Sequence, residues 1–193
     1  MARQREFDRS ATLNKAQELF WQKGYAATST ADLLDAMQIG RQSMYDTFGD
    51  KRSLYLEALR QYCEDSTNDL LRHLKGDSPL GAVANMLTAF ASRPLRDNAK
   101  GCMGVNAVCE FGNSDAEINA LHETYSARLN GAVEQQLRAA AKAGEIPART
   151  DVRQASAFIA ATLSGMKVSA KAGAGIATLK HIATYAMKAL QAG

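Results

Sequence analysis

Hydrophobic residues recur along this chain at intervals of three and four, which is the spacing of one face of an α-helix. The first such stretch, over about 10–23, places Leu13, Ala16 and Phe20 on one face. The sequence has no sustained period-two alternation and no hairpin dipeptide between β-branched runs, which are the signals of strands. The pattern therefore predicts an all-α protein.

Proline and glycine divide this pattern into separate helices. Pro79, Pro94 and Pro147 stand where a helix is expected to break, and glycines follow several periodic stretches, because glycine tolerates the left-handed conformation at a helix end. Ser114 and Glu117 have the spacing of a capping box that opens a long helix. The breaks predict nine helices, over about 10–23, 30–37, 41–47, 51–74, 79–92, 102–110, 114–142, 151–170 and 176–191.

The lengths of these helices predict two domains. Short helices come first, so we expect a small unit over 1–50 and a larger helical body over 51–193. The helix over 51–74 is expected to belong to both, because no proline-rich or Gly/Ser-rich linker separates them. A continuous helix would transmit motion between the two parts.

Composition restricts the class of protein. A chain of 193 residues that is 46% hydrophobic is long enough to bury a sizeable core. No run approaches about 18 apolar residues, and no apolar segment follows the charged N-terminus, so we expect neither a membrane span nor a signal peptide. Three cysteines without regular spacing do not make a disulfide framework, which favours a cytoplasmic location.

Net charge gives little support to any one partner. The formal net charge is +3, and residues 1–55 contribute +1 of it, from eight Lys and Arg and seven Asp and Glu. Nucleic-acid binders often carry a basic footprint. Evidence for DNA binding must therefore come from the positions of charged residues and not from their sum.

The most informative stretch runs from 27 to 51, ATSTADLLDAMQIGRQSMYDTFGDK. It predicts a short helix, a tight turn at 37–39 and a second short helix with a polar start. Leu33, Met37 and Met44 can pack inward, which leaves Arg41 and Gln42 outside at the start of the second helix. A helix-turn-helix needs this arrangement, because its second helix presents side chains to base edges in the major groove.

The same residues resemble a known family. The pattern TSxxDLxxAxxIxxxxxYxxFxxK is similar to the signature of TetR-type transcriptional regulators, and the preceding LNKAQELFWQKGYAATS resembles the first helix of that family. The resemblance is specific over residues 10–60. It implies a nine-helix, two-domain fold, with an N-terminal three-helix DNA-binding unit and a C-terminal helical domain for ligand binding and dimerisation.

The resemblance also implies roles for individual residues. The start of the second short helix would read base edges, since Arg can bond guanine and Gln can bond adenine through two hydrogen bonds. Residues around the start of the first short helix would contact phosphate, and the signature tyrosine and lysine would hold the DNA backbone. Arg3 and Arg5 would form an arm on the DNA. The DNA-binding residues implied in this way are Thr28, Ser29 and Thr30 for phosphate, Arg41, Gln42 and Ser43 for bases, and Tyr45 and Lys51 for the backbone.

Two positions depart from the family's usual pattern. Gln38 stands in the turn where the family has glycine, so a residue other than glycine is expected in a left-handed conformation. Gly40 stands where the family usually has the serine that caps the recognition helix, and this change costs about a few tenths of a kcal/mol of helix stability. Neither departure is expected to alter the fold.

The C-terminal helices are expected to form a dimer interface. Residues 155–170 combine bulky Phe158, Ile159 and Met166 with many small residues, and residues 176–190 repeat this composition. Such a stripe fills a protomer's own core more often than an interface. A protein that binds both halves of a palindromic DNA site must be a dimer, however. We therefore expect a homodimer in which helices 151–170 and 176–191 form a four-helix bundle.

The family places a ligand pocket in the body. Met and aromatic side chains suit adaptable hydrophobic sites, so the expected effector is small and apolar or aromatic. A place in the core is the alternative for each candidate residue. The candidate lining residues are Met86, Phe90, Met103, Asn106, Phe111, His122, Tyr125 and Met166.

Cys102 is a candidate redox residue. It follows Lys100 near an expected helix start, where a cation and the helix dipole would lower the pKa of its thiol. A regulator that senses electrophiles or oxidants through Cys102 is one alternative function, and a small buried side chain is the other interpretation. The cysteines and histidines show neither C-x-x-C nor H-x-x-x-H spacing, so we expect no bound metal and no other cofactor.

Functions of other classes have little support. The sequence lacks a phosphate loop, a G-x-S-x-G motif and a dinucleotide fingerprint, and Cys102 with His122 20 residues on is a poor nucleophile-base pair. An enzyme is not expected, and a helical enzyme or binding module without a DNA role is the alternative class. The sequence is interpreted as a transcriptional regulator, by default a repressor. It would bind palindromic double-stranded operator DNA as a dimer and be released by a small effector.

Overall fold

The computed structural model describes residues 7–94, 97 and 99–192, and the described residues form nine α-helices and no β-strand. This confirms the all-α prediction for that part of the chain. Arg3 and Arg5, the expected DNA arm, lie outside the described residues. The helices are α1 (Arg9–Lys23), α2 (Thr30–Met37), α3 (Arg41–Phe48), α4 (Lys51–His73), α5 (Pro79–Ala91), α7 (Met103–Phe111), α8 (Ala116–Lys142), α9 (Val152–Lys171) and α10 (Ile176–Ala192).

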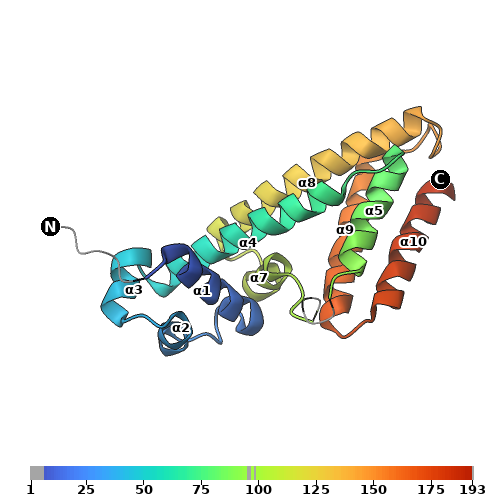
Figure 1. The fold of residues 1–193 in the computed structure, drawn as a ribbon. Helices are drawn as coiled ribbons and strands as arrows, with labels where there is room; N and C mark the ends of the chain where they lie inside the picture. The colour runs from blue at the N-terminus through green and yellow to red at the C-terminus, as the bar shows by residue number, and fades with distance from the viewer. Residues whose placement is uncertain (1–6, 95–96, 98, 193) are drawn as a thin grey trace.

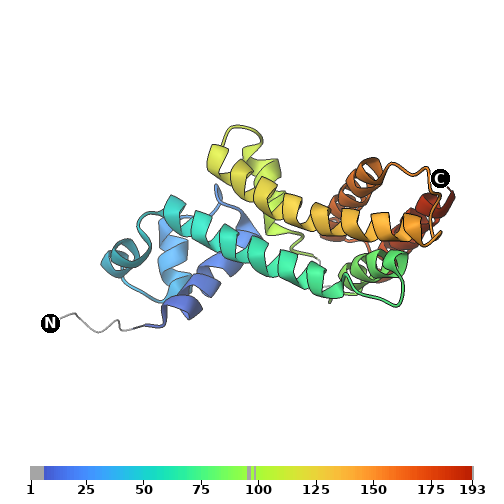
Figure 2. The same ribbon diagram turned by 90° about the horizontal axis from the view of Figure 1, so that it is seen from above.

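The helices are arranged in an elongated molecule with α1–α3 at one end (Figure 1). The long helices α4 and α8 run side by side from this end into the body, and both views show them as its longest members (Figures 1 and 2). Helices α5, α9 and α10 gather at the opposite end, and α7 lies between the two ends. Helix α4 is therefore one continuous rod that connects the helix-turn-helix end to the body.

Side-chain caps fix where most of these helices begin. An Asp or Ser side chain accepts a hydrogen bond from a first-turn N–H, which satisfies a donor that the helix itself leaves free. The expected capping box at Ser114 is wrong: Asp115 is the N-cap of α8 and accepts from the Ile118 N–H, while the Ser114 hydroxyl donates to the Phe111 carbonyl. The capping residues are Asp8, Ser29, Asp50, Ser78, Asp115 and Asp151.

The turn of the helix-turn-helix contains the predicted left-handed residue. Gln38 has φ 57° and ψ 44°, the left-handed conformation, and it is the one residue other than glycine with positive φ among those described. Its side-chain amide donates to the Asp35 carbonyl at 2.6 Å, which ties the turn to the end of α2. Gly40 is the N-cap of α3 and supplies no side-chain hydrogen bond, as expected.

Two hydrophobic cores divide the molecule, and the division does not fall at residue 50. The first core joins α1–α3 to the N-terminal half of α4 and also takes in Met103, Ala107 and Ile118 from the body. The second core lies among the rest of α4, α5, α8, α9 and α10. The body therefore contributes directly to the core that holds the helix-turn-helix, and the 1–50 boundary stays a proposal.

The hydrophobic stripes expected at a dimer interface lie mostly inside the protomer. Ile159 and Met166 of α9 and Leu179 of α10 are buried in the second core. The reason is that α9 and α10 pack against each other and α10 also packs against α5, so their most apolar faces are already covered.

Among the described helices, none is long and apolar enough to cross a membrane.

Candidate nucleic-acid interface and body cavity

Helix α3 is anchored by its apolar face and exposes its polar start. Met44 is fully buried and Phe48 is nearly so, in the core that also contains Leu33 and Met37 of α2. Two turns of helix fixed in this way leave the opposite face open to solvent. The helix-turn-helix therefore presents a rigid polar edge.

The predicted base readers stand at that edge. Arg41 and Gln42 are exposed, and Ser43 beside them is half-buried. The Gln42 side-chain amide donates to the Asp46 carboxylate at 2.8 Å, which orients Gln42 along the outer face of α3. Arg41 is without an ion pair among the described residues and can reach outward.

The predicted backbone contacts flank the same edge. Tyr45 follows on α3 and is 43% exposed, although it is a large aromatic residue. Lys51 lies at the start of α4 with its ammonium 4.2 Å from the centre of the Tyr25 ring. A cation held over an aromatic face keeps its charge in a fixed place.

The start of α2 has a complete capping box. The Asp32 N–H donates to the Ser29 hydroxyl oxygen at 3.1 Å, and the Asp32 carboxylate accepts from the Ser29 N–H at 2.9 Å. Ser29 is exposed and Thr30 is half-buried, so both remain at the surface. Thr28 does not, because it is fully buried and its hydroxyl donates to the Gly24 carbonyl at 2.6 Å. Thr28 therefore shapes the turn before α2, and its hydroxyl is not exposed for the predicted phosphate contact.

Glu110 joins the body to the helix-turn-helix unit. Its carboxylate, at the end of α7, accepts from the Ala26 N–H at 2.7 Å and from the Tyr25 N–H at 3.1 Å. A Cβ on Gly24 would lie 3.0 Å from this carboxylate, and Gly24 has φ +82°, so only glycine suits the position. The turn between α1 and α2 is thereby tied to α7.

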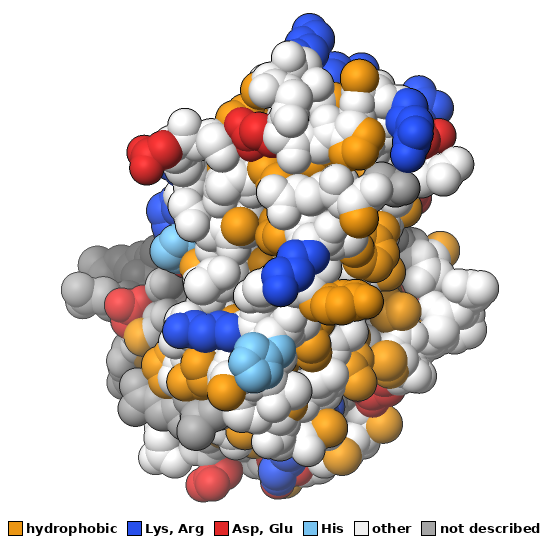
Figure 3. Space-filling view, turned by 90° about the vertical axis from the view of Figure 1, so that its right-hand side faces the viewer, with side chains coloured by type: hydrophobic (Ala, Val, Ile, Leu, Met, Phe, Trp, Pro, Cys, Tyr) orange, Lys and Arg blue, Asp and Glu red, His pale blue; other side chains and the backbone are white. Residues whose placement is uncertain are grey.

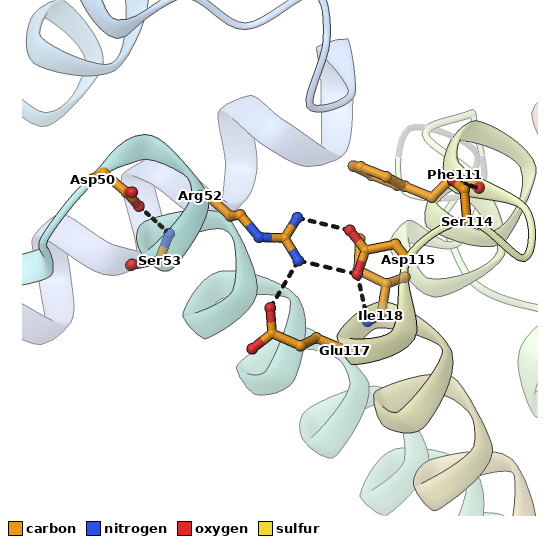
Figure 4. A network of polar contacts seen from close by, with 8 residues as sticks. All are labelled: Asp50, Arg52, Ser53, Phe111, Ser114, Asp115, Glu117 and Ile118. Carbon is orange, nitrogen blue, oxygen red and sulfur yellow. Dashed lines mark hydrogen bonds and ion pairs between the residues drawn. The ribbon is translucent and has the colours of Figure 1, made fainter.

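Arg52, in the first turn of α4, makes a second connection between the helix-turn-helix unit and the body. Its guanidinium bonds both Asp115 oxygens, at 2.7 and 3.0 Å, and also the Glu117 carboxylate at 2.8 Å (Figure 4). Asp115 caps α8 at the same time, so the ion pair joins the starts of α4 and α8. A guanidinium that bonds both oxygens of one carboxylate fixes the relative orientation of the two groups as well as their distance.

An aromatic cluster lies between these two connections. Tyr55 of α4 is 5.0 Å from Phe20 and from Tyr25, and 5.8 Å from Phe111 of α7, measured between ring centres. Burial, and then the nearby Glu110 charge, raise the pKa of the Tyr55 hydroxyl well above its ordinary value, so Tyr55 stays neutral. The cluster packs the helix-turn-helix unit onto the body.

The body contains a cavity of about 270 Å³ between α4, α7, α8 and α9, partly open to solvent. Its wall combines hydroxyl, amide and thiol groups with aliphatic side chains. This mixture of an apolar wall with a few polar groups is typical of small-molecule sites. The wall is formed by Tyr62, Cys63, Ser66, Thr67, Leu70, Cys102, Gly104, Val105, His122, Tyr125, Ser126, Leu129, Asn130, Ala160, Ala161, Leu163, Ser164 and Lys167.

Comparison with known proteins assigns the chain to a family. The family model for bacterial regulatory proteins of the tetR family matches residues 13–58, and the model for the tetracyclin repressor-like C-terminal domain matches residues 78–186. The transcriptional regulator YezE of Bacillus subtilis (strain 168) is 34% identical over 148 residues, 76% of each chain. This chain belongs to the TetR family.

Other relatives agree with this TetR-family assignment. The transcriptional repressor ComR of Escherichia coli (strain K12) is 30% identical over 184 residues, 94% of this chain and 88% of ComR. A cysteine mutant of the TetR-family regulator CifR, solved with a 26-base-pair double-strand operator DNA, is 30% identical with a TM-score of 0.77 and covers 97% of this chain and 99% of its own. The protein is a DNA-binding transcriptional regulator and not an enzyme, as its relatives are regulators.

The cavity of this TetR-family protein has a different lining from the one predicted. Of the candidates, His122 and Tyr125 lie in its wall, and Asn106 lies in a neighbouring hollow. The others fill space elsewhere, because Met and aromatic side chains on the inner helix faces pack into the cores. Met86, Phe90 and Met166 are in the second core, Met103 is in the first, and Phe111 packs on Tyr25 and Tyr55.

Cys102 is buried, with 6% of its surface exposed. Burial by itself raises the pKa of the Cys102 thiol, but the Lys167 charge and the Val105 N–H outweigh it and hold the pKa below its ordinary value. The expected cation, Lys100, instead pairs with Glu18 at 2.5 Å. A thiol inside the wall is shielded from oxidants, so the thiol-sensing alternative is not favoured.

The capping box at α2 should make the stability of this TetR-family protein depend on pH. Hydrogen bonds from Ser29, with the Lys23 ammonium at 3.1 Å, lower the pKa of Asp32 from 3.8 to about 2. A lowered folded-state pKa means that the carboxylate stabilises the fold above pH 3.8 and that this contribution is lost as the pH falls towards 2. Asp32→Asn should therefore lower the melting temperature at neutral pH, and the difference should shrink in acid. Asp35→Asn on the same helix is the control; equal effects of Asp32→Asn at both pH values would contradict the prediction.

Two residues at this site escaped the sequence reasoning. Glu110 is an exposed acidic residue at the end of a helix, and nothing in its neighbours along the chain indicates two distant N–H partners. Lys167 does carry a signal, because it is a single charge within the apolar stretch AFIAATLSGMKVSA. Charged residues rarely lie on the inner face of a helix without a reason.

Proposed function

We propose that this protein is a repressor that binds a palindromic operator as a homodimer and leaves it when a small effector occupies the body cavity. The supporting observation is the anchored α3 with Arg41 and Gln42 exposed at its start. The operator complex of CifR and the repressor names of ComR and of BdcR, also of Escherichia coli (strain K12), support the DNA target and the sign of regulation. Such a protein acts on DNA in the cytoplasm.

The proposed DNA contacts follow from exposure. Arg41, Gln42 and Ser43 would read base edges in the major groove, since they stand at the N-terminal end of α3. The remaining contacts would be to the phosphate backbone and would fix the register of the protein on the duplex. These backbone residues are Ser29, Thr30, Tyr45 and Lys51.

The dimer would form through surfaces of α9 and α10 that the protomer leaves open. Phe158 and Val168 of α9 are 42% and 53% exposed, with the small residues Ala161 and Gly165 between them on the same face. Tyr185 of α10 is 75% exposed. The view of the end of the molecule where α10 lies shows hydrophobic side chains among Lys, Arg and His side chains (Figure 3). Exposed aromatic residues beside small ones favour close packing of a second copy across a two-fold axis.

Charge placed on this face should break the dimer. Phe158→Glu is expected to shift the protein from dimer to monomer at micromolar concentration, because two copies would bring unpaired carboxylates together at the axis. Sedimentation velocity measures this, with Ala127→Glu on the exposed face of α8 as the matched control. A Phe158→Glu protein that remains dimeric would contradict the α9–α10 interface.

The effector would act by shifting the population of two dimer shapes. In the DNA-binding shape the two α3 helices lie one turn of DNA apart, and effector binding would favour another separation. The cavity shares α4 and α7 with the connections at Arg52 and Glu110, so a change at its wall reaches the helix-turn-helix unit directly.

A gel shift with the DNA upstream of the protein's own gene tests the proposed function. Retention should be saturable, should survive an excess of unrelated DNA, and should fall steeply with salt as phosphate contacts are lost. A compound that occupies the cavity should then abolish retention. Equal retention of unrelated DNA, or none, would contradict the proposal.

A further inference from the structure

The body cavity carries a single positive charge that the protein leaves uncompensated. Among the described residues that line it, Lys167 is the only Lys or Arg, and Asp and Glu do not occur. Lys167 is half-buried on α9. Its ammonium has neither a hydrogen bond nor a carboxylate partner in the part of the chain that the structure describes.

Other cations that bridge elements of this protein are paired. Arg9 meets Glu57 at 2.6 Å, Arg52 meets Asp115 at 2.7 Å, and Lys171, one turn beyond Lys167, donates to the Asn106 side chain at 2.9 Å. A charge withdrawn from water without a partner is costly, and interior charges are normally paired. Among the half-buried Lys and Arg residues of the described chain, Lys167 differs in having neither a carboxylate partner nor an aromatic ring beneath its charge, and a bound anion would explain this.

The Lys167 charge changes the pKa of thiols in the cavity wall. The Lys167 ammonium lowers the pKa of the Cys102 thiol against the effect of burial, and it opposes the burial that raises the pKa of Cys63 to about 12. Hydroxyl donors of Ser66 and Ser164 stand in the same wall. The wall thus offers a cation and several neutral donors, which together are complementary to an anion.

The remainder of the wall is apolar. Leu70 of α4, Leu129 of α8 and Leu163 of α9 line the cavity, together with the Ala160 and Ala161 methyl groups. A volume of about 270 Å³ has room for a small organic molecule. The cavity therefore suits a compact apolar body that carries one acidic group.

We propose that the effector is a small organic acid whose carboxylate pairs with Lys167 and whose apolar body lies against the leucines of α4, α8 and α9. This inference rests on the proposed function, since it identifies the cavity as the effector site. It adds a negative charge to the apolar or aromatic effector expected from the sequence.

The position of Lys167 connects such an anion to the DNA-binding unit. Lys167, Cys102 and Val105 line both this cavity and a neighbouring hollow, and that hollow is bordered by Gly24 and Glu110. The wall between the two spaces therefore stands beside the carboxylate that holds the turn between α1 and α2. An anion that draws the Lys167 side chain into the cavity would change that wall.

Matched acid and amide probes test the proposal on the full-length protein. Calorimetry would measure binding of benzoate against benzamide and of hexanoate against hexanamide, which separates the charge from the aromatic or straight-chain body. In the wild type each acid that fits should bind about tenfold to a hundredfold more tightly than its amide, as expected for a charge-assisted pair. Lys167→Met should remove that preference, Lys167→Arg should keep much of it, and Lys142→Met, outside the cavity, should leave it unchanged.

The outcomes separate this proposal from the proposed function. If no acid binds more tightly than its amide, or if Lys167→Met, folded by its melting curve, retains the preference, the organic-acid effector is wrong. Fluorescence anisotropy with operator DNA, measured without any acid, tests DNA binding by itself. A protein that prefers acids through Lys167 but binds no DNA would support the organic-acid site and contradict the proposed function as a regulator. A protein that binds DNA but shows no preference for acids would support the regulator and contradict the organic-acid site.

Discussion

Arg41→Ala and Gln42→Ala are each expected to weaken operator binding by about 1–3 kcal/mol and to relax the base preference at one position. Both side chains are exposed at the start of α3, and their functional groups fit the edges of guanine and adenine in the major groove. Met44 and Phe48 hold the helix from its other face, so neither substitution should alter the fold. Anisotropy with the operator and with single-base variants of it measures both effects.

Lys51→Ala is the contrasting variant for this prediction. A lost phosphate contact should weaken binding equally on all sequences and should reduce the salt dependence by about one counterion. If Arg41→Ala behaved in this way, with uniform weakening and an unchanged base preference, Arg41 would be a backbone contact and base reading would fall to its neighbours.

Tyr55→Ala is expected to cost about 3–5 kcal/mol of the free energy of unfolding, as truncation of a large buried aromatic ring usually does. Tyr55 is 2% exposed and its ring contacts Phe20, Tyr25 and Phe111, so its loss opens a cavity where the helix-turn-helix unit meets the body. These contacts come from three elements other than α4, namely α1, the turn after it and α7. A partial collapse of any one of them would not fill the space.

Chemical denaturation of the protein measures this loss, with Tyr55→Phe as the matched control. The control keeps the ring and removes the hydroxyl, so its stability should stay within about 1 kcal/mol of the wild type. A small effect of Tyr55→Ala would mean that the aromatic cluster is not what packs the two parts together. The Arg52 and Glu110 connections would then have to carry the coupling.

Short-range chemistry explains why much of the fold could be predicted from the sequence. Helix positions depend on the spacing of apolar residues and on nearby breakers, and the nine helices of the described chain begin and end close to where that spacing placed them. The left-handed Gln38 and the uncapped start of α3 at Gly40 are likewise set by residues within one turn. The helix-turn-helix is specified within about 25 consecutive residues, so its family resemblance was informative.

Long-range packing decided what the sequence could not. Helical spacing shows that Met86 and Phe90 share an inner face, but only the arrangement of α5 against α8 and α10 shows that this face fills a core and not the cavity. Threonine is a residue type that often contacts phosphate, yet the turn before α2 buries the Thr28 hydroxyl.

The sequence by itself determined the helical class, the helix-turn-helix and its exposed polar start, because each depends on neighbours along the chain. The tertiary structure decided which groups meet across the molecule. Glu110 reaches the turn between α1 and α2 from 84 residues away, and Arg52 reaches Asp115 across 63 residues. Lys167 lies in the wall of a cavity to which four helices contribute. Such contacts arise from how helices pack, and no local pattern specifies them.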